Sequence, residues 1–156
     1  MGVPNRPSHL QRDATALYEA TTAFIRLYQF RDRDHALRFG LTVVQAYTLD
    51  ILLASGGASL TQLAQGLRLD KSTMSRVISG MTRHALVEWS RPEQDRRAKH
   101  IVASPEGKRR YERLRHAIVR DNARLLAPYT RAGRRAVISA LWQLAHRAGS
   151  PAAPAR

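Results

Sequence analysis

Apolar residues recur at steps of three and four over long stretches of the chain, a spacing typical of amphipathic helices. One such stretch covers residues 10–38. Two more lie towards the other end, where Ser104 and Pro105 are typical of a helix N-terminus and Thr130 can cap the last helix. These long stripes are separated by the middle of the chain and have little within it to pack on. We therefore expect them to bury one another across the two-fold axis of a homodimer.

The middle of the chain holds three shorter helical segments. Residues 43–55 follow a capping-box pair and are apolar on more than one face, so we expect this helix at the centre of the fold. Ser59 begins a short helix with the same capping spacing, and Asp70 caps a third helix over residues 71–84. Two short helices joined by so few residues predict a helix-turn-helix.

The third of these helices has two contrasting faces. One is apolar and consists of Met74, Val77, Ile78 and Met81. The other carries short hydroxyl side chains and arginines without any acid, namely Ser72, Ser75, Arg76, Ser79 and Arg83. A solvent-facing helix normally mixes Glu with Lys or Arg, whereas short side chains allow close approach and arginine can bind guanine or phosphate through two hydrogen bonds. The pattern favours a helix in the major groove of DNA over a charge-poor surface helix.

After Leu86 the hydrophobic period changes to two. Residues 87–90 and 101–104 alternate between apolar and polar and enclose a polar loop, a pattern typical of a β-hairpin with an extended tip. A hairpin directly after a helix-turn-helix predicts a winged helix. The tip holds four basic and two acidic residues: Arg91, Arg96, Arg97, Lys99, Glu93 and Asp95.

The charge balance points to a polyanionic partner. Lys plus Arg number 26 against 12 Asp plus Glu, which gives a formal net charge of +14. Such an excess fits nucleic acid or an anionic membrane surface. No stretch is apolar enough to span a bilayer, and the N-terminus lacks the apolar segment of a secretory signal. We therefore expect a cytoplasmic protein with no membrane association.

Catalytic and metal chemistry find little support in the sequence. Cysteine is absent, which excludes a disulfide scaffold, a thiolate zinc site and a cysteine nucleophile. The six histidines form no His-x-x-x-His pair, so a metal site would need ligands from distant segments. Neither a Gly-x-Ser-x-Gly motif nor a glycine-rich phosphate loop is present. We expect no enzyme activity, no metal and no cofactor.

Several of these segments stand in a familiar order and spacing: Leu41–Thr42, Leu60–Ala64, Leu69–Arg76, Leu86–Val87, Asp95–Lys99 and Pro105–Gly107. Over residues 41–114 this set resembles the MarR (multiple antibiotic resistance regulator) family. The sequence departs from the family pattern at two places, where His84–Ala85 replaces the usual glycine and Ala103–Ser104 replaces the usual Leu-Thr. The absence of cysteine separates it from the members that sense organic hydroperoxides with a reactive thiol.

The resemblance implies a mainly α-helical fold with a small β-hairpin wing, organised as a single MarR-type domain over residues 1–156. A winged helix-turn-helix at residues 42–104 is flanked by dimerisation helices at residues 10–38 and 105–148. By composition, residues 149–156 are a disordered tail. The homodimer is expected to place its two winged helices on a pseudo-palindromic operator in double-stranded DNA.

The residues expected to contact DNA are Lys71, Ser72, Thr73, Ser75, Arg76, Ser79, Arg83, Arg96, Arg97 and Lys99. In the family an Asp-x-Arg pattern in the wing lets the aspartate brace an arginine that enters the minor groove, where the potential favours guanidinium. This pattern matches Asp95 and Arg97. An isolated acid among basic residues also fits such an orienting role better than it fits repulsion of DNA.

Family members often bind aromatic or phenolic effectors between the first helices and the dimer helices. By resemblance, Tyr28, His35, Arg38 and Tyr47 line such a pocket. The alternative is that both tyrosines belong to the core and that residues 31–38 are a solvated helix end. The sequence as a whole predicts a transcriptional regulator, a repressor relieved by a ligand. The main alternative is an architectural or non-specific DNA-binding protein without an effector, and a protein-interaction module is disfavoured by the basic outer helix face.

Overall fold

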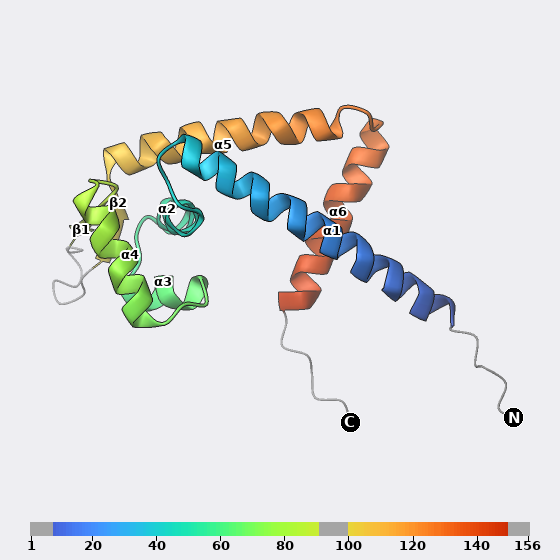
Figure 1. Ribbon diagram of the computed structural model, residues 1–156, viewed down its shortest axis with the longest axis horizontal. Helices are drawn as coiled ribbons and strands as arrows, with labels where there is room; N and C mark the ends of the chain where they lie inside the picture. Colours follow the sequence, from blue (N-terminus) through green and yellow to red (C-terminus); the bar gives the residue numbers. More distant parts are fainter. Residues whose placement is uncertain (1–7, 91–99, 150–156) are drawn as a thin grey trace, which may run out of the picture. The chain divides into compact units, whose positions relative to one another are not determined.

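The computed structural model of the protein describes residues 8–90 and 100–149. The chain divides into two compact units, residues 1–115 and residues 116–156. The elements in chain order are α1 (His9–Arg38), α2 (Val43–Ser55), α3 (Leu60–Gly66), α4 (Lys71–Arg83), β1 (Val87–Ser90), β2 (His100–Ala103), α5 (Pro105–Leu126) and α6 (Arg131–Gly149) (Figure 1). The prediction of a mainly helical chain with one β-hairpin is confirmed.

Local capping chemistry fixes where the first helices begin. At the N-terminus of α2, the Gln45 N–H donates to Thr42 Oγ1 at 3.2 Å and the Thr42 N–H donates to Gln45 Oε1 at 2.9 Å. The same reciprocal pair opens α1 at Ser8 and α3 at Ser59. Each box satisfies two backbone donors that a helix start leaves unpaired. The expected starts of α2 and α3 are confirmed, and α1 begins at His9, one residue before the start predicted from periodicity.

The core of the first unit forms around α2. This helix contacts α1, α3, α4 and β2, which confirms its expected central position. Its Leu49 and Leu52 are buried, as are Leu63 of α3 and Ile101 of β2. Burial of these aliphatic side chains is the main favourable contribution to folding of the unit. It packs both the helix-turn-helix and the hairpin against α2.

The hairpin gains a third partner from the loop before α3. β1 and β2 are antiparallel, with Val87 opposite Ala103 and Trp89 opposite Ile101. Ala58 pairs with Ile101 on the other edge of β2, through hydrogen bonds of 3.0 and 2.8 Å in the two directions. The preceding Gly57 has φ +138°, a conformation that other residues rarely adopt. The glycine pair therefore both ends α2 and turns the chain into this pairing.

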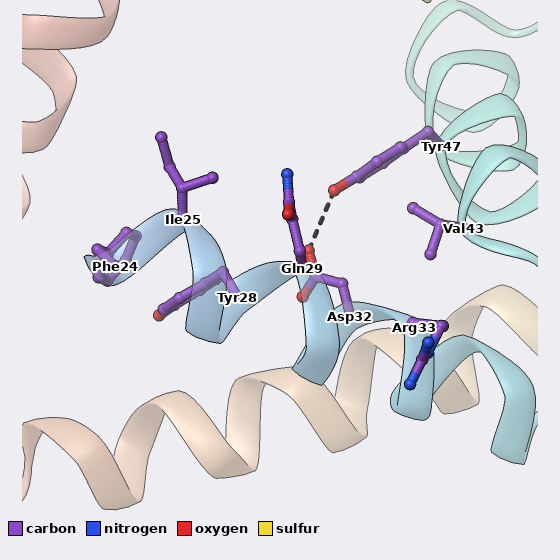
Figure 2. A pocket seen from close by; sticks show the side chains of 8 residues that line it. All are labelled: Phe24, Ile25, Tyr28, Gln29, Asp32, Arg33, Val43 and Tyr47. Atoms are coloured by element: carbon purple, nitrogen blue, oxygen red, sulfur yellow. Dashed lines mark hydrogen bonds between the residues drawn. The ribbon is translucent and has the colours of Figure 1, made fainter. Parts of the chain in front are cut away.

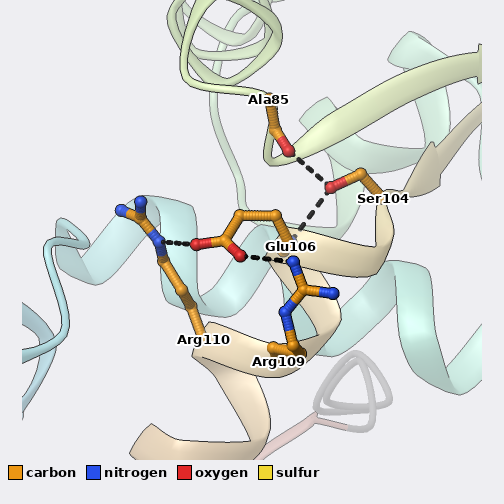
Figure 3. A network of polar contacts seen from close by, with 6 residues as sticks. Ala85, Ser104, Glu106, Arg109 and Arg110 are labelled. Carbon is orange, nitrogen blue, oxygen red and sulfur yellow. Dashed lines mark hydrogen bonds and ion pairs between the residues drawn. The ribbon is translucent and has the colours of Figure 1, made fainter.

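The start of α5 is locked against the end of the helix-turn-helix (Figure 3). The buried Ser104 hydroxyl donates to the Ala85 carbonyl at 2.5 Å and accepts the Gly107 N–H at 3.0 Å. A Cβ on Gly107 would lie 2.0 Å from the Leu86 carbonyl oxygen, so only glycine fits there. Glu106 accepts from Arg109 and Arg110, both at 2.7 Å, and these bonds lower its pKa, with that from Arg110 contributing most. The Pro-Glu-Gly motif is thus the joint between the wing and α5.

Ala85 lies just before the Leu86–Val87 pair, at a backbone position that favours glycine. Its φ is +53°, in the left-handed region where a Cβ is unfavourable. The chain turns there from α4 into β1, and the Ala85 carbonyl is held by Ser104. The departure noted in the sequence therefore falls on a strained backbone position, away from the exposed face of α4.

The second unit consists of the last part of α5 and α6. α6 carries exposed apolar residues, which are Val137, Ile138, Leu141, Trp142 and Leu144. α1 in the first unit carries a comparable set, which includes Leu17, Phe24, Ile25, Leu27 and Phe30. Exposed apolar stripes of this length are typical of surfaces that bind another protein.

Candidate nucleic-acid interface

Helix α4 has the two faces that its sequence predicts. Met74, Ile78 and Met81 are buried against the rest of the unit. The opposite face is exposed and carries Lys71, Ser72, Ser75, Arg76, Ser79 and Arg83. Val77, predicted on the apolar face, is only half-buried. Three large buried side chains at steps of three and four hold the helix, so that its outer face stands free in the monomer.

The basic residues of this face have no acidic partner among the residues that the structure describes. Within residues 8–90 and 100–149, no ion pair involves Lys71, Arg76 or Arg83. By contrast, Arg109 and Arg110 of α5 share a carboxylate. The α4 cations therefore remain available to an external anion, and short serines between them allow it to approach closely.

Asp70 organises the beginning of α4. Its carboxylate accepts from the Ser72 hydroxyl at 2.6 Å, from the Thr73 N–H at 2.7 Å and from the Thr73 hydroxyl at 2.7 Å. These bonds, that from Ser72 first, hold the pKa of Asp70 well below its usual range. Asp70 is therefore ionised at neutral pH and caps the helix, as predicted.

This cap limits what two of the predicted contact residues can offer a ligand. A hydroxyl carries one proton and two lone pairs. Because Ser72 and Thr73 donate their protons to Asp70, each can only accept a further hydrogen bond in this arrangement. Thr73 is also half-buried. The hydroxyls of Ser75 and Ser79 have no hydrogen bond within the described residues, so they can either donate or accept.

The described part of the wing consists of the strands β1 and β2. The predicted contacts Arg96, Arg97 and Lys99 and the predicted brace Asp95 lie outside the described residues. Trp89 on β1, which the sequence analysis did not single out, is 52% exposed beside α4. Val87 and Trp89 alternate with the polar Glu88 and Ser90, which predicted the strand, but only the fold shows that Val87 is buried whereas Trp89 on the same side is exposed.

A pocket of about 600 Å³ lies between α1 and α2 (Figure 2). It is lined by Phe24, Ile25, Tyr28, Gln29, Asp32, Arg33, Val43 and Tyr47. Of the four predicted effector residues, Tyr28 and Tyr47 line it and the other two do not. His35 is buried, with its Nδ1 2.8 Å from the Arg31 carbonyl, and Arg38 is exposed at the end of α1.

The pocket combines aromatic walls with a polar end that the sequence analysis missed. The Tyr47 hydroxyl donates to Asp32 Oδ2 at 3.1 Å (Figure 2), and burial, followed by the Asp32 carboxylate, raises the pKa of Tyr47. Phe24 and Tyr28 stack with ring centroids 4.0 Å apart. An aromatic guest with a polar substituent fits such a lining.

Other kinds of site find no geometry in the described part of the chain. No group of three His, Asp or Glu residues there could hold a metal ion. No single described helix is both long and apolar enough to cross a membrane; α1 and α2 reach that length and composition only as a pair bent by 80°, as buried core helices also can.

Residues 39–98 match the model of the MarR family. No curated protein matches the sequence. Among solved structures, a MarR family protein from Bacillus stearothermophilus has a TM-score of 0.83 at 22% identity, over 89% of this chain and 97% of that chain. RV1404 from Mycobacterium tuberculosis has a TM-score of 0.73 at 21% identity, over 94% of this chain and 99% of that chain.

A third similar solved structure contains bound nucleic acid. A mutant of S. aureus MepR, described as bound to an oligodeoxyribonucleotide, has a TM-score of 0.60 at 18% identity, over 83% of this chain and 96% of that chain. At these identities the structures establish the shared fold, that of winged-helix MarR regulators. Residues 39–98 are thus similar to the MarR family model, and the chain shares the fold of solved MarR family structures.

Proposed function

We propose that the protein is a sequence-specific regulator of transcription that binds double-stranded DNA as a homodimer. The observation that carries this proposal is the outer face of α4, a helix fixed by its buried face. Three basic side chains alternate there with serines and form no ion pair with any described residue. An α-helix of this kind fits the major groove, whose base edges carry a pattern of donors and acceptors that differs for every base pair.

Distinct roles follow for the predicted contact residues. Arg76, on the exposed face with Ser72 and Ser75, is placed to reach base edges. Lys71 and Arg83, at the two ends of α4, suit phosphate contacts, which position the helix without reading sequence. Arg97 of the wing, oriented by Asp95, is proposed to read a narrow minor groove, and Arg96 and Lys99 to add phosphate contacts. The oligodeoxyribonucleotide bound to the MepR mutant supports DNA as the partner class.

The dimer is proposed from the apolar residues that α1 and α6 leave exposed. Leu10 is 77%, Leu27 71% and Trp142 63% exposed in the single chain. Burying such stripes against a second copy is favourable because apolar surface leaves water. We expect an interface above roughly 1,000 Å², the size of specific and stable interfaces. A monomeric mass in light scattering at micromolar concentration contradicts this part of the proposal.

The pocket between α1 and α2 is the proposed effector site. Its stacked Phe24 and Tyr28 suit an aromatic ring, and its Tyr47–Asp32 pair suits a phenol or another polar substituent. Because the pocket borders α2, which supports the helix-turn-helix, a ligand there can alter the position of α4. Release from DNA by such a ligand makes the protein a repressor relieved by its effector.

One experiment separates the proposal from its main alternative. DNase I footprinting on the DNA that flanks the protein's own gene is expected to show one protected site with two-fold symmetry. Uniform protection along the fragment instead indicates an architectural, non-specific DNA-binding protein. In both cases log K should fall with log salt by about 0.9 per phosphate contact, so a flat salt dependence argues against DNA as the partner of the basic surface.

A further inference from the structure

Trp89 stands at the edge of the exposed face of α4. Its strand β1 is in contact with α4 (Figure 1). Between them lies a groove of about 280 Å³. It is lined by Leu60 at the start of α3, by Ser75, Ile78, Ser79 and Thr82 of α4, and by Trp89. The groove thus joins the indole directly to two serines of the proposed recognition face.

Packing among the described residues does not account for an exposed indole at this position. Val87, two residues earlier on the same side of the strand, is 2% exposed, whereas Trp89 is 52% exposed. Leaving a large aromatic ring in water forgoes the stabilisation that its burial provides. Large aromatic residues on a surface are enriched where a protein meets a partner, since they offer both an apolar face and a polar N–H.

The dimensions of DNA indicate what this ring meets. The major groove is about 12 Å wide and an α-helix with its side chains is about 10–12 Å across, so a helix fills the groove. A side chain that stands next to such a helix therefore faces the wall of the groove, which is the sugar–phosphate backbone. Trp89 occupies this place relative to α4.

We propose that Trp89 packs on the sugar–phosphate backbone at the edge of the major groove and donates its indole N–H to a phosphate oxygen. The proposal rests on the DNA-binding function proposed above and adds a contact that no sequence motif indicates. The lining fits an anionic partner, because the described residues that form it contribute three hydroxyl groups and no carboxylate. Thr82 uses its proton on the Ile78 carbonyl at 3.0 Å, while those of Ser75 and Ser79 have no acceptor within the described residues.

A neutral contact with the backbone has three measurable consequences. Loss of the indole in Trp89→Ala is expected to weaken binding by at least about tenfold, as for a hydrogen bond to a charged group. The factor should be the same for the operator and for random duplex, since phosphates carry no sequence information. The salt slope should not change, because no cation is removed.

The chain contains two tryptophans, which allows a direct test. Trp142→Phe leaves Trp89 as the sole tryptophan, and Trp89→Phe leaves Trp142 of α6, itself 63% exposed, as the matched control. Each full-length variant is titrated with a dye-labelled 30-base-pair duplex of random sequence at low salt, and with the operator fragment once footprinting has defined it. Anisotropy of the dye reports binding independently of tryptophan emission. We expect the Trp89 emission to shift in parallel with anisotropy and the Trp142 emission to stay constant.

The outcomes separate the two proposals. If anisotropy rises but Trp89 emission stays constant and Trp89→Ala binds as tightly as the unmodified chain, the indole contact is wrong and the DNA-binding function stands. If no duplex changes the anisotropy, the proposed function itself is wrong. If Trp89→Ala loses affinity for the operator alone, the indole reads bases and the backbone contact is wrong. Trp89→Phe, which keeps an aromatic ring but lacks the N–H, should show a partial loss of DNA affinity. This variant keeps the test valid if the alanine variant misfolds.

Discussion

Replacement of Gly107 by alanine tests the joint between the wing and α5. Helix propensity alone favours alanine by about 1 kcal/mol. Against this, the added Cβ would lie 2.0 Å from the Leu86 carbonyl oxygen and 3.0 Å from Leu49 Cδ2. An ordinary carbon–oxygen contact is about 3.3 Å, so the start of α5 must move by more than an ångström. Such a shift strains the Ser104 hydrogen bonds and typically costs about 1–3 kcal/mol or more. We expect a net loss of stability.

Gly80→Ala is the matched control, because it makes the same change within α4 where the nearest group, the Arg83 guanidinium, is 4.0 Å away. It should stabilise the protein by up to about 1 kcal/mol. Urea unfolding followed by circular dichroism, at one fixed protein concentration, gives both values. With a slope of about 2 kcal/mol/M, a loss of 1–2 kcal/mol in Gly107→Ala lowers the midpoint by roughly 0.5–1 M. If both variants gain stability equally, the close approach of α5 to Leu86 is refuted.

Four further results are expected. Ala85→Gly should raise the unfolding midpoint modestly, because it removes a Cβ from a residue at φ +53°. Burial, followed by the Asp50 carboxylate, raises the pKa of Tyr111, so the folded state keeps the phenol proton at a pH where the unfolded state loses it. The free energy of unfolding should therefore fall as pH rises above the ordinary tyrosine pKa of 10.0, and it should fall less steeply in Tyr111→Phe. Asp70→Asn keeps a capping oxygen and loses a negative charge, so it should bind DNA at least as tightly as the unmodified chain. Asp70→Ala also loses the cap and should bind more weakly. Equal tightening in both variants would show that the cap of α4 contributes nothing to DNA binding. Arg76→Ala should cost about 1–3 kcal/mol on the operator and relax discrimination there, while the equal charge change in Arg147→Ala should not.

The parts of the fold that depend on near neighbours in the chain were predictable. The capping pairs of α2 and α3 join residues three apart, and the faces of α4 follow from a period of 3.6. The same holds for the alternation of the two strands. Each of these features is decided within a few residues of its own position, so the sequence order contains the information directly.

Contacts between residues far apart in the chain are encoded by no local pattern, and one of them lies in the pocket between α1 and α2. Tyr47 meets Asp32 across 15 residues, and Tyr111 donates to Asp50 across 61. His35 lies seven residues after Tyr28 and so shares its helix face, yet the last turns of α1 pack into the core there and bury the imidazole. A helical period predicts which residues share a face, but not where along the helix the core begins.

The remaining apolar surface bears on how the protein binds DNA. The core of the first unit forms around α2, whereas large apolar residues of α1 and α6 remain exposed in one chain. Under the proposed function, dimerisation buries those stripes and also doubles the number of recognition helices. Mass action then couples the two events: DNA that holds two winged helices favours the dimer by the same factor by which the dimer favours DNA. A substitution of Leu27 or Leu141 by a charged residue should therefore weaken operator binding through the monomer–dimer equilibrium while leaving the weak non-specific affinity of one winged helix intact.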